Sequence, residues 1–169
     1  SENVNKQRIL DGLRIINEDF RKTNPDTNQI VSAFKGIAAD SEIDFRLAQK
    51  DPDGNCTDGI TRTVSIQTMS AGNGVKSLVR WPNERYLNVW MVNTIASGAG
   101  GYAYYPGASP AIDGIVLRAG QFGPGYRSLT HEIGHYLNLP HTWGSTNDPE
   151  LASNCNTDDG VGDTPNTIG

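Results

Sequence analysis

Three histidines within eleven residues near the end of the chain constrain the fold more than any other sequence feature. His131 and His135 are four residues apart, so on a helix they share one face, about 6 Å apart along its axis. A straight helix would carry His141 to a different side, so the chain must turn before it. Asn138 enters the left-handed conformation at modest cost, and Pro140 cannot continue a helix. We therefore predict a helix that ends in a sharp turn and brings the three imidazoles together.

These imidazoles form the ligand set of a zinc site with an open position. Catalytic zinc takes three protein ligands and leaves the fourth position to water. Glu132 directly follows the first histidine, which turns its carboxylate toward that water. The pattern predicts that His131, His135 and His141 bind Zn²⁺ and that Glu132 is the general base in hydrolysis of an internal peptide bond. Two alternatives stay open: Glu150 as third ligand, although it lies in a loop-like stretch, and a module that binds metal without cleaving anything.

Apolar spacing elsewhere predicts one α+β domain. Ile9, Leu13, Ile16 and Phe20 recur every three or four residues, which places them on one stripe of a backing helix. Alternating apolar residues predict half-buried strands, and the run at 86–92 is apolar on both faces, as in a covered strand. The predicted helices span residues 5–22 and 126–138, and the predicted strands span 43–47, 60–66, 86–92, 102–105 and 112–117.

The composition excludes several classes of partner. Fourteen Lys and Arg against 19 Asp and Glu give a net charge of −5, which repels nucleic acid. No apolar run is long enough to span a membrane, so no membrane partner is expected. Cys56 and Cys155 are too few for a cysteine-based zinc cluster. They are consistent with one disulfide or with partners outside this chain.

The segment around the histidines resembles the metzincin clan of zinc peptidases, whose extended motif has three histidines and a glycine before the last. Asn138 stands at that glycine position. The flanking sequences are similar to the pappalysin family, including ulilysin-like bacterial and archaeal proteases. The matching segments are residues 128–130, 142–144, 86–90, 101–107, 45–48, 51–55 and 59–60.

The resemblance implies a secreted endopeptidase that is made as a zymogen. It implies a metzincin-like α+β fold with a mixed twisted sheet, a backing helix and an active-site helix. Residues 1–138 would form the upper lobe, and residues 139–169 would begin the lower lobe with the third zinc ligand. Gly101, Tyr102, Ala103 and Tyr104 would line the cleft as an edge strand that pairs antiparallel with a peptide or protein substrate. Core packing is the alternative for the two tyrosines.

The resemblance also implies a calcium site near the end of the chain. Asp159, Val161, Asp163 and Thr164 match the family's calcium-binding segment, in which carboxylates and main-chain carbonyls supply oxygen ligands. Asp158 is a possible extra ligand. A solvated acidic turn is the alternative for this segment.

One feature expected of the clan does not occur in this sequence. Metzincins place a methionine in a turn beneath the zinc, after the third histidine, and the only methionines here are Met69 and Met91. We therefore expect the rest of the lower lobe to lie outside this chain, either on a companion chain or removed by truncation. Cys155 would then pair with a cysteine in that part, and Cys56 has no assigned partner.

Overall fold

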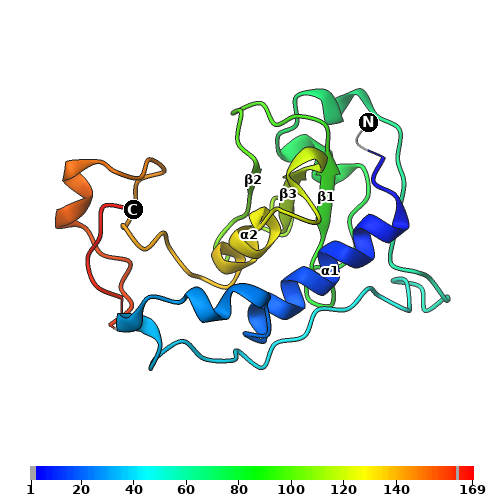
Figure 1. Ribbon diagram of the computed structural model, residues 1–169. Helices are drawn as coiled ribbons and strands as arrows, with labels where there is room; N and C mark the ends of the chain where they lie inside the picture. Colours follow the sequence, from blue (N-terminus) through cyan, green and yellow to red (C-terminus); the bar gives the residue numbers. More distant parts are fainter. Residues whose placement is uncertain (1–2, 163) are drawn as a thin grey trace.

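The computed structural model describes residues 3–162 and 164–169, which fold into two α-helices and a three-stranded sheet joined by 3-10 turns (Figure 1). The helices are α1 (Lys6–Phe20) and α2 (Ser128–Tyr136), and the strands are β1 (Val89–Val92), β2 (Gly101–Tyr102) and β3 (Ile115–Arg118). The turns are η1 (Pro25–Gln29), η2 (Ser32–Phe34), η3 (Ile66–Met69), η4 (Asn73–Ser77), η5 (Ala119–Gln121) and η6 (Ala152–Asn156). Within the described ranges, every helix is too short or too polar to cross a bilayer.

The sheet is mixed, as the resemblance implied, with the strand order β1-β3-β2. The central strand β3 runs parallel to β1, with Val89 opposite Ile115, and antiparallel to β2, with Gly101 opposite Leu117. Its residues Ile115, Val116 and Leu117 are completely buried, because both faces of the sheet are covered. Among the residues that the structure describes, β2 pairs only with β3, so its other side is a free edge of the sheet.

Both helices cover the same face of the sheet (Figure 1). Ile16 of α1, Ile115 of β3 and Ile133 of α2 form one buried cluster there. The 3-10 turns η3 and η4 cover the opposite face, where the core residues are Ala71, Val75, Val92, Ile95 and Val116. The sheet therefore lies between α2 and these turns.

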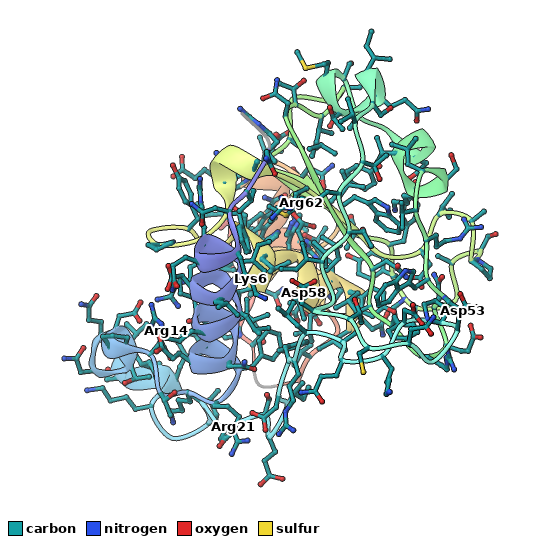
Figure 2. All side chains as sticks on the ribbon, turned by 90° about the vertical axis from the view of Figure 1, so that its right-hand side faces the viewer. Lys6, Arg14, Arg21, Asp53, Asp58 and Arg62 are labelled. Atoms are coloured by element: carbon teal, nitrogen blue, oxygen red, sulfur yellow. The ribbon has the colours of Figure 1, made fainter. Side chains whose placement is uncertain are left out.

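The backing helix has the predicted stripe. Ile9, Leu13, Ile16 and Phe20 pack toward the core, and the Asn5 side chain caps the helix by accepting from the Arg8 N–H at 2.8 Å. Figure 2 shows Lys6 at the start of α1 facing Asp58, and the two form an exposed ion pair at 3.1 Å. Such a pair adds little stability, so the buried stripe holds the helix in place.

A buried carboxylate joins the two helices. The largely buried Asp19 of α1 accepts a hydrogen bond from Thr130 of α2 at 2.6 Å and pairs with Arg127. This contact fixes the first turn of α2, just before the predicted metal ligands.

The predicted strand at 43–47 does not form. The Asn17 side chain of α1 instead donates to the Phe45 carbonyl at 2.9 Å and accepts from the Phe45 N–H at 2.7 Å. The Phe45 ring packs edge-on against Phe20, with centroids 5.0 Å apart. One side chain of the helix thus satisfies the backbone groups that a neighbouring strand would have satisfied.

The predicted strand at 60–66 is also wrong. Val64 is fully exposed and Ile66 is 86% exposed, so the alternation has no core to face. The segment instead runs into η3, where the Ser65 hydroxyl accepts from the Gln67 N–H at 3.2 Å. The predicted strands at 86–92 and 112–117 are confirmed with the shorter or shifted bounds of β1 and β3. The strand predicted at 102–105 is wrong for most of its length, because β2 is only Gly101–Tyr102 and residues 103–105 are not in a strand.

Candidate metal centre

The short helix α2 carries His131, Glu132 and His135, and the buried Ile133 anchors it to the sheet. The helix ends as the sequence predicts. Asn138 has a left-handed backbone, with φ of 75°, and the Leu139 N–H donates back to the Gly134 carbonyl at 2.9 Å. This reversal returns the chain toward the helix face that bears the histidines.

The three imidazoles converge on one point. The Nε2 atom of His135 lies 2.9 Å from Nε2 of His131 and 3.2 Å from Nε2 of His141. Among residues 3–162 and 164–169, this is the one group of three His, Cys, Asp or Glu side chains close enough to share a metal ion. Glu150, the alternative third ligand, is not part of it.

Hydrogen bonds fix the tautomers of two of these rings. Nδ1 of His135 lies 2.7 Å from the Leu139 carbonyl oxygen, and Nδ1 of His141 lies 2.9 Å from the Thr146 carbonyl oxygen. A carbonyl can only accept, so each Nδ1 carries the proton and each Nε2 presents its lone pair. Two lone pairs 3.2 Å apart repel unless a cation lies between them.

The residues therefore fit a zinc ion. Zn–N bonds of about 2.0–2.1 Å in tetrahedral geometry separate ligand nitrogens by about 3.3 Å, close to the separations seen here. Burial, followed by the neighbouring His135 and His141, lowers the pKa of His131. A lowered pKa favours the neutral imidazole, which is the form that binds metal.

Glu132 is 6% exposed and lies between α2 and the sheet edge. Burial raises the pKa of its carboxyl to about 7, and the N–H of Ala103 opposes this by donating to the carboxylate. A metal cation nearby would further favour the charged carboxylate. Glu132 also approaches Gly101 closely: a Cβ atom there would lie 2.9 Å from both Cγ and Oε1 of Glu132.

Side chains of the predicted substrate-binding strand, residues 101–104, lie alternately on the two sides of the sheet. Gly101 and Ala103 lie on the side of α2, where Gly101 borders Glu132 and Ala103 packs on the core cluster. The rings of Tyr102 and Tyr104 lie on the opposite side, over Lys76. Pairing of a peptide with the main chain of this strand stays a prediction.

An open cleft of about 460 Å³ lies beside the histidines. Its walls come from the end of α1, from α2 and from the turn after α2, and include Asp19, Asn24, Thr130, Leu139 and Trp143. A cleft of this size next to the metal ligands can hold amino-acid side chains of a bound peptide.

Several contacts made by the ligands were not predicted from the sequence. The Trp143 ring stacks on His141, with centroids 4.6 Å apart, and its Nε1 donates to the Thr146 carbonyl at 3.0 Å. The Tyr105 ring contacts His135 edge-on, with centroids 5.8 Å apart. The Leu139 and Thr146 carbonyls orient the ligands through main-chain atoms, so no side-chain pattern could have revealed them.

Of the residues in the predicted calcium segment, Asp163 lies outside the described residues. The Asp159 carboxylate accepts from the Val161 N–H at 2.9 Å, and the Val161 carbonyl accepts from the Thr164 N–H at 3.0 Å. Asp158 directly precedes Asp159 in the sequence. Calcium binding by this segment stays a prediction.

The two cysteines do not pair with each other, since both are exposed free thiols. A disulfide between Cys56 and Cys155 is therefore excluded, and pairing with cysteines outside this chain stays a prediction.

Comparisons with known proteins identify relatives of this chain. The family model of M43 peptidases, described as pregnancy-associated plasma protein-A, matches residues 72–169. An extracellular metalloprotease of Arthroderma otae is 31% identical over 121 residues, which make up 63% of this chain and 42% of that protein. The chain thus spans less than half of this curated relative.

Two solved structures share the fold over nearly the whole chain. Mature mirolysin of Tannerella forsythia in complex with a cleaved peptide is 34% identical, with a TM-score of 0.81, and the match covers 99% of this chain and 67% of that one. A promirolysin mutant of the same organism is 33% identical, with a TM-score of 0.82, over 100% of this chain and 60% of that one.

Proposed function

Because this chain belongs to the pregnancy-associated plasma protein-A, or pappalysin, family of metallopeptidases, we propose that it carries the catalytic zinc site of a secreted endopeptidase. The observation that carries the proposal is the convergence of the three Nε2 atoms, with the lone pairs of His135 and His141 held 3.2 Å apart beside the buried Glu132. A zinc ion held there would act as a Lewis acid, lowering the pKa of water and stabilising the oxyanion of the attacked carbonyl.

The chain's own residues supply the proton transfers. Glu132 takes a proton from the attacking water and delivers it to the leaving amine, so the peptide bond is broken with one water consumed. The Ala103 N–H holds the carboxylate in place for both transfers. Leu139 and Thr146 keep two of the imidazoles in the metal-binding tautomer.

The substrate is an extended peptide or protein segment. Among the described residues β2 is the edge strand of the sheet, and a peptide can add to its outer side as a further strand. The cleaved peptide in the mirolysin structure supports this class of substrate. The extracellular relative supports secretion, and the existence of promirolysin supports synthesis as a zymogen.

We extend the proposal to the whole protein, because the match covers only 67% of the mature mirolysin chain. The remainder of the lower lobe, on a longer or companion chain, would complete the cleft next to residues 139–169. Calcium bound by the segment at 158–164 would brace that region, with Asp159 and Asp163 as carboxylate ligands.

Substitution of Glu132 by Ala tests the proposal. The variant should bind zinc with wild-type stoichiometry and lose nearly all turnover of a quenched peptide, because the ligands remain and the base does not. His131→Ala is the matched variant, and it should lose both zinc and turnover. Zinc content is measured by atomic absorption. Substantial turnover by Glu132→Ala would refute the assigned role, and a wild-type protein that bound zinc but cleaved no peptide would favour the non-catalytic binding module.

A further inference from the structure

Lys76 of η4 is a buried lysine that the proposed chemistry does not use. Its exposed fraction is 0%, although lysine is almost never fully buried in proteins. Its ammonium group donates to the carbonyls of Ile112 and Gly114, the second at 3.2 Å. These two carbonyls belong to the segment that leads into β3, so the lysine joins η4 to the sheet.

Three aromatic rings surround the same ammonium group. Its Nζ lies 4.7 Å from the ring centroid of Tyr104, 4.9 Å from that of Tyr102 and 5.7 Å from that of Trp90. All three distances are within the range of cation–π attraction, which strengthens when the cation is removed from water. We call Lys76 and these three rings the lysine cage.

The cage holds the edge strand from one side. Asn73 of η4 donates to the Tyr104 hydroxyl at 2.7 Å and accepts from the Tyr102 hydroxyl at 3.2 Å. Residues of η4 therefore contact both tyrosines in two ways: Asn73 forms hydrogen bonds with both hydroxyls, and Lys76 attracts both rings. Because side chains alternate along an extended chain, fixing Tyr102 and Tyr104 also fixes Ala103 between them and Gly101 just before them.

Burial of the Lys76 ammonium group costs free energy of folding. Burial lowers the pKa of Lys76 to about 8, which the Asp113 carboxylate partly opposes. The titratable groups that face the lysine are this carboxylate and the phenols of Tyr102 and Tyr104. An apolar side chain in the same place would avoid the loss of hydration, so stability alone does not explain a lysine here.

We propose that Lys76 is a positioning residue for substrate binding: through the lysine cage it holds β2 so that its free edge pairs with an extended peptide. The inference rests on the proposed function, because it assigns a role in the same cleft. Lys76 lies on the face of the sheet opposite α2 and acts through the tyrosines. Its loss should therefore weaken peptide binding along β2 and leave the zinc ligands in place.

The experiment compares Lys76→Met with wild-type protein on two quenched peptides. Methionine keeps an unbranched apolar stem and removes the charge. Both peptides share the residues around the cleaved bond, but one is extended so that it pairs along β2 and the other is truncated there. We expect KM for the extended peptide to rise about ten-fold, equivalent to about 1.4 kcal/mol, with kcat and zinc content near wild type. KM for the truncated peptide should change less than two-fold.

Two further variants keep the test decisive. Lys35→Met removes an exposed lysine of the same charge and should leave both KM values unchanged. Asn73→Ala removes the phenol anchor without altering the buried charge, and it should show a smaller rise for the extended peptide only. If Lys76→Met does not fold, Asn73→Ala decides the question.

The outcomes separate the two proposals. Equal changes for both peptides, or no change in either KM, would overturn the positioning role and leave the proposed function intact. Absence of hydrolysis by the wild-type, zinc-loaded protein would overturn the proposed function, and the positioning role with it.

Discussion

Replacement of Gly101 by alanine should displace the catalytic base without removing the metal. A Cβ atom at this position would lie 2.8 Å from Leu117 Cδ1 and 2.9 Å from both Cγ and Oε1 of Glu132. Gly101 is not among the glycines with positive φ, so alanine is compatible with the backbone. The effect of the substitution is therefore steric and falls on the base and on the buried strand β3.

The expected magnitude follows from these distances. Non-bonded carbon atoms prefer separations of about 3.5–4.0 Å, so Glu132 or β2 must move by roughly 0.6–1 Å. A displacement of about 1 Å in a catalytic group can lower the rate about 100-fold. Overpacking of the core also destabilises a protein by about 1–3 kcal/mol. We expect kcat to fall about 100-fold in Gly101→Ala.

The assay measures kcat on a quenched peptide, together with zinc content and the free energy of unfolding in urea. Gly100→Ala is the matched control: its Cβ atom would lie 3.6 Å from the Gln121 side chain, an ordinary contact. This neighbouring variant should retain wild-type kcat. Wild-type kcat in Gly101→Ala, or loss of zinc in place of loss of rate, would show that Gly101 does not control the position of the base.

Three further predictions concern stability and metal binding. Asn138→Gly should preserve zinc affinity, whereas Asn138→Ala should cost about 1 kcal/mol and weaken zinc binding, because φ is 75° there; urea unfolding and zinc titration measure both. Chelation should lower the melting temperature and added zinc should restore it, since bound metal favours the folded state; an unchanged melting temperature in scanning calorimetry contradicts this. The pKa of Lys76 is 10.5 in the unfolded chain and about 8 in the folded chain, so between these pH values the unfolded chain binds more protons. The stability of the wild type relative to Lys76→Met should therefore rise by up to about 1.4 kcal/mol per pH unit between these values, and a flat difference in urea unfolding would refute the lowered pKa.

The metal centre was predictable because its geometry is local. The separation of His131 and His135 is set by one helical turn, and the position of His141 is set by the left-handed Asn138 a few residues later. Each requirement can be recognised in a short segment of sequence. The mixed sheet followed from the family resemblance, since residue patterns alone give strands without their order.

The strand predicted at 43–47 shows what a local pattern cannot decide. Alternation indicates an extended chain with one buried side, and Phe45 is indeed packed on one side against Phe20. Alternation does not indicate which group forms hydrogen bonds with the backbone N–H and carbonyl of the segment. Here a single asparagine of α1, Asn17, is 28 residues away and takes that role. Partners at such distances in sequence depend on the whole fold.

Two features of the candidate site depend on such distant contacts, and both meet at β2. Lys76 is not among the residues predicted from the sequence to be buried or functional, and lysine is almost never fully buried in proteins, yet this side chain is buried under Tyr102 and Tyr104. The family resemblance places Gly101 in a cleft-lining strand, but it does not reveal that the missing side chain allows the close approach of Glu132. A buried cation and a glycine within a strand are each unfavourable by local rules. Since both act on the same short strand from opposite faces, the requirement they share is the exact placement of that strand beside the metal ligands.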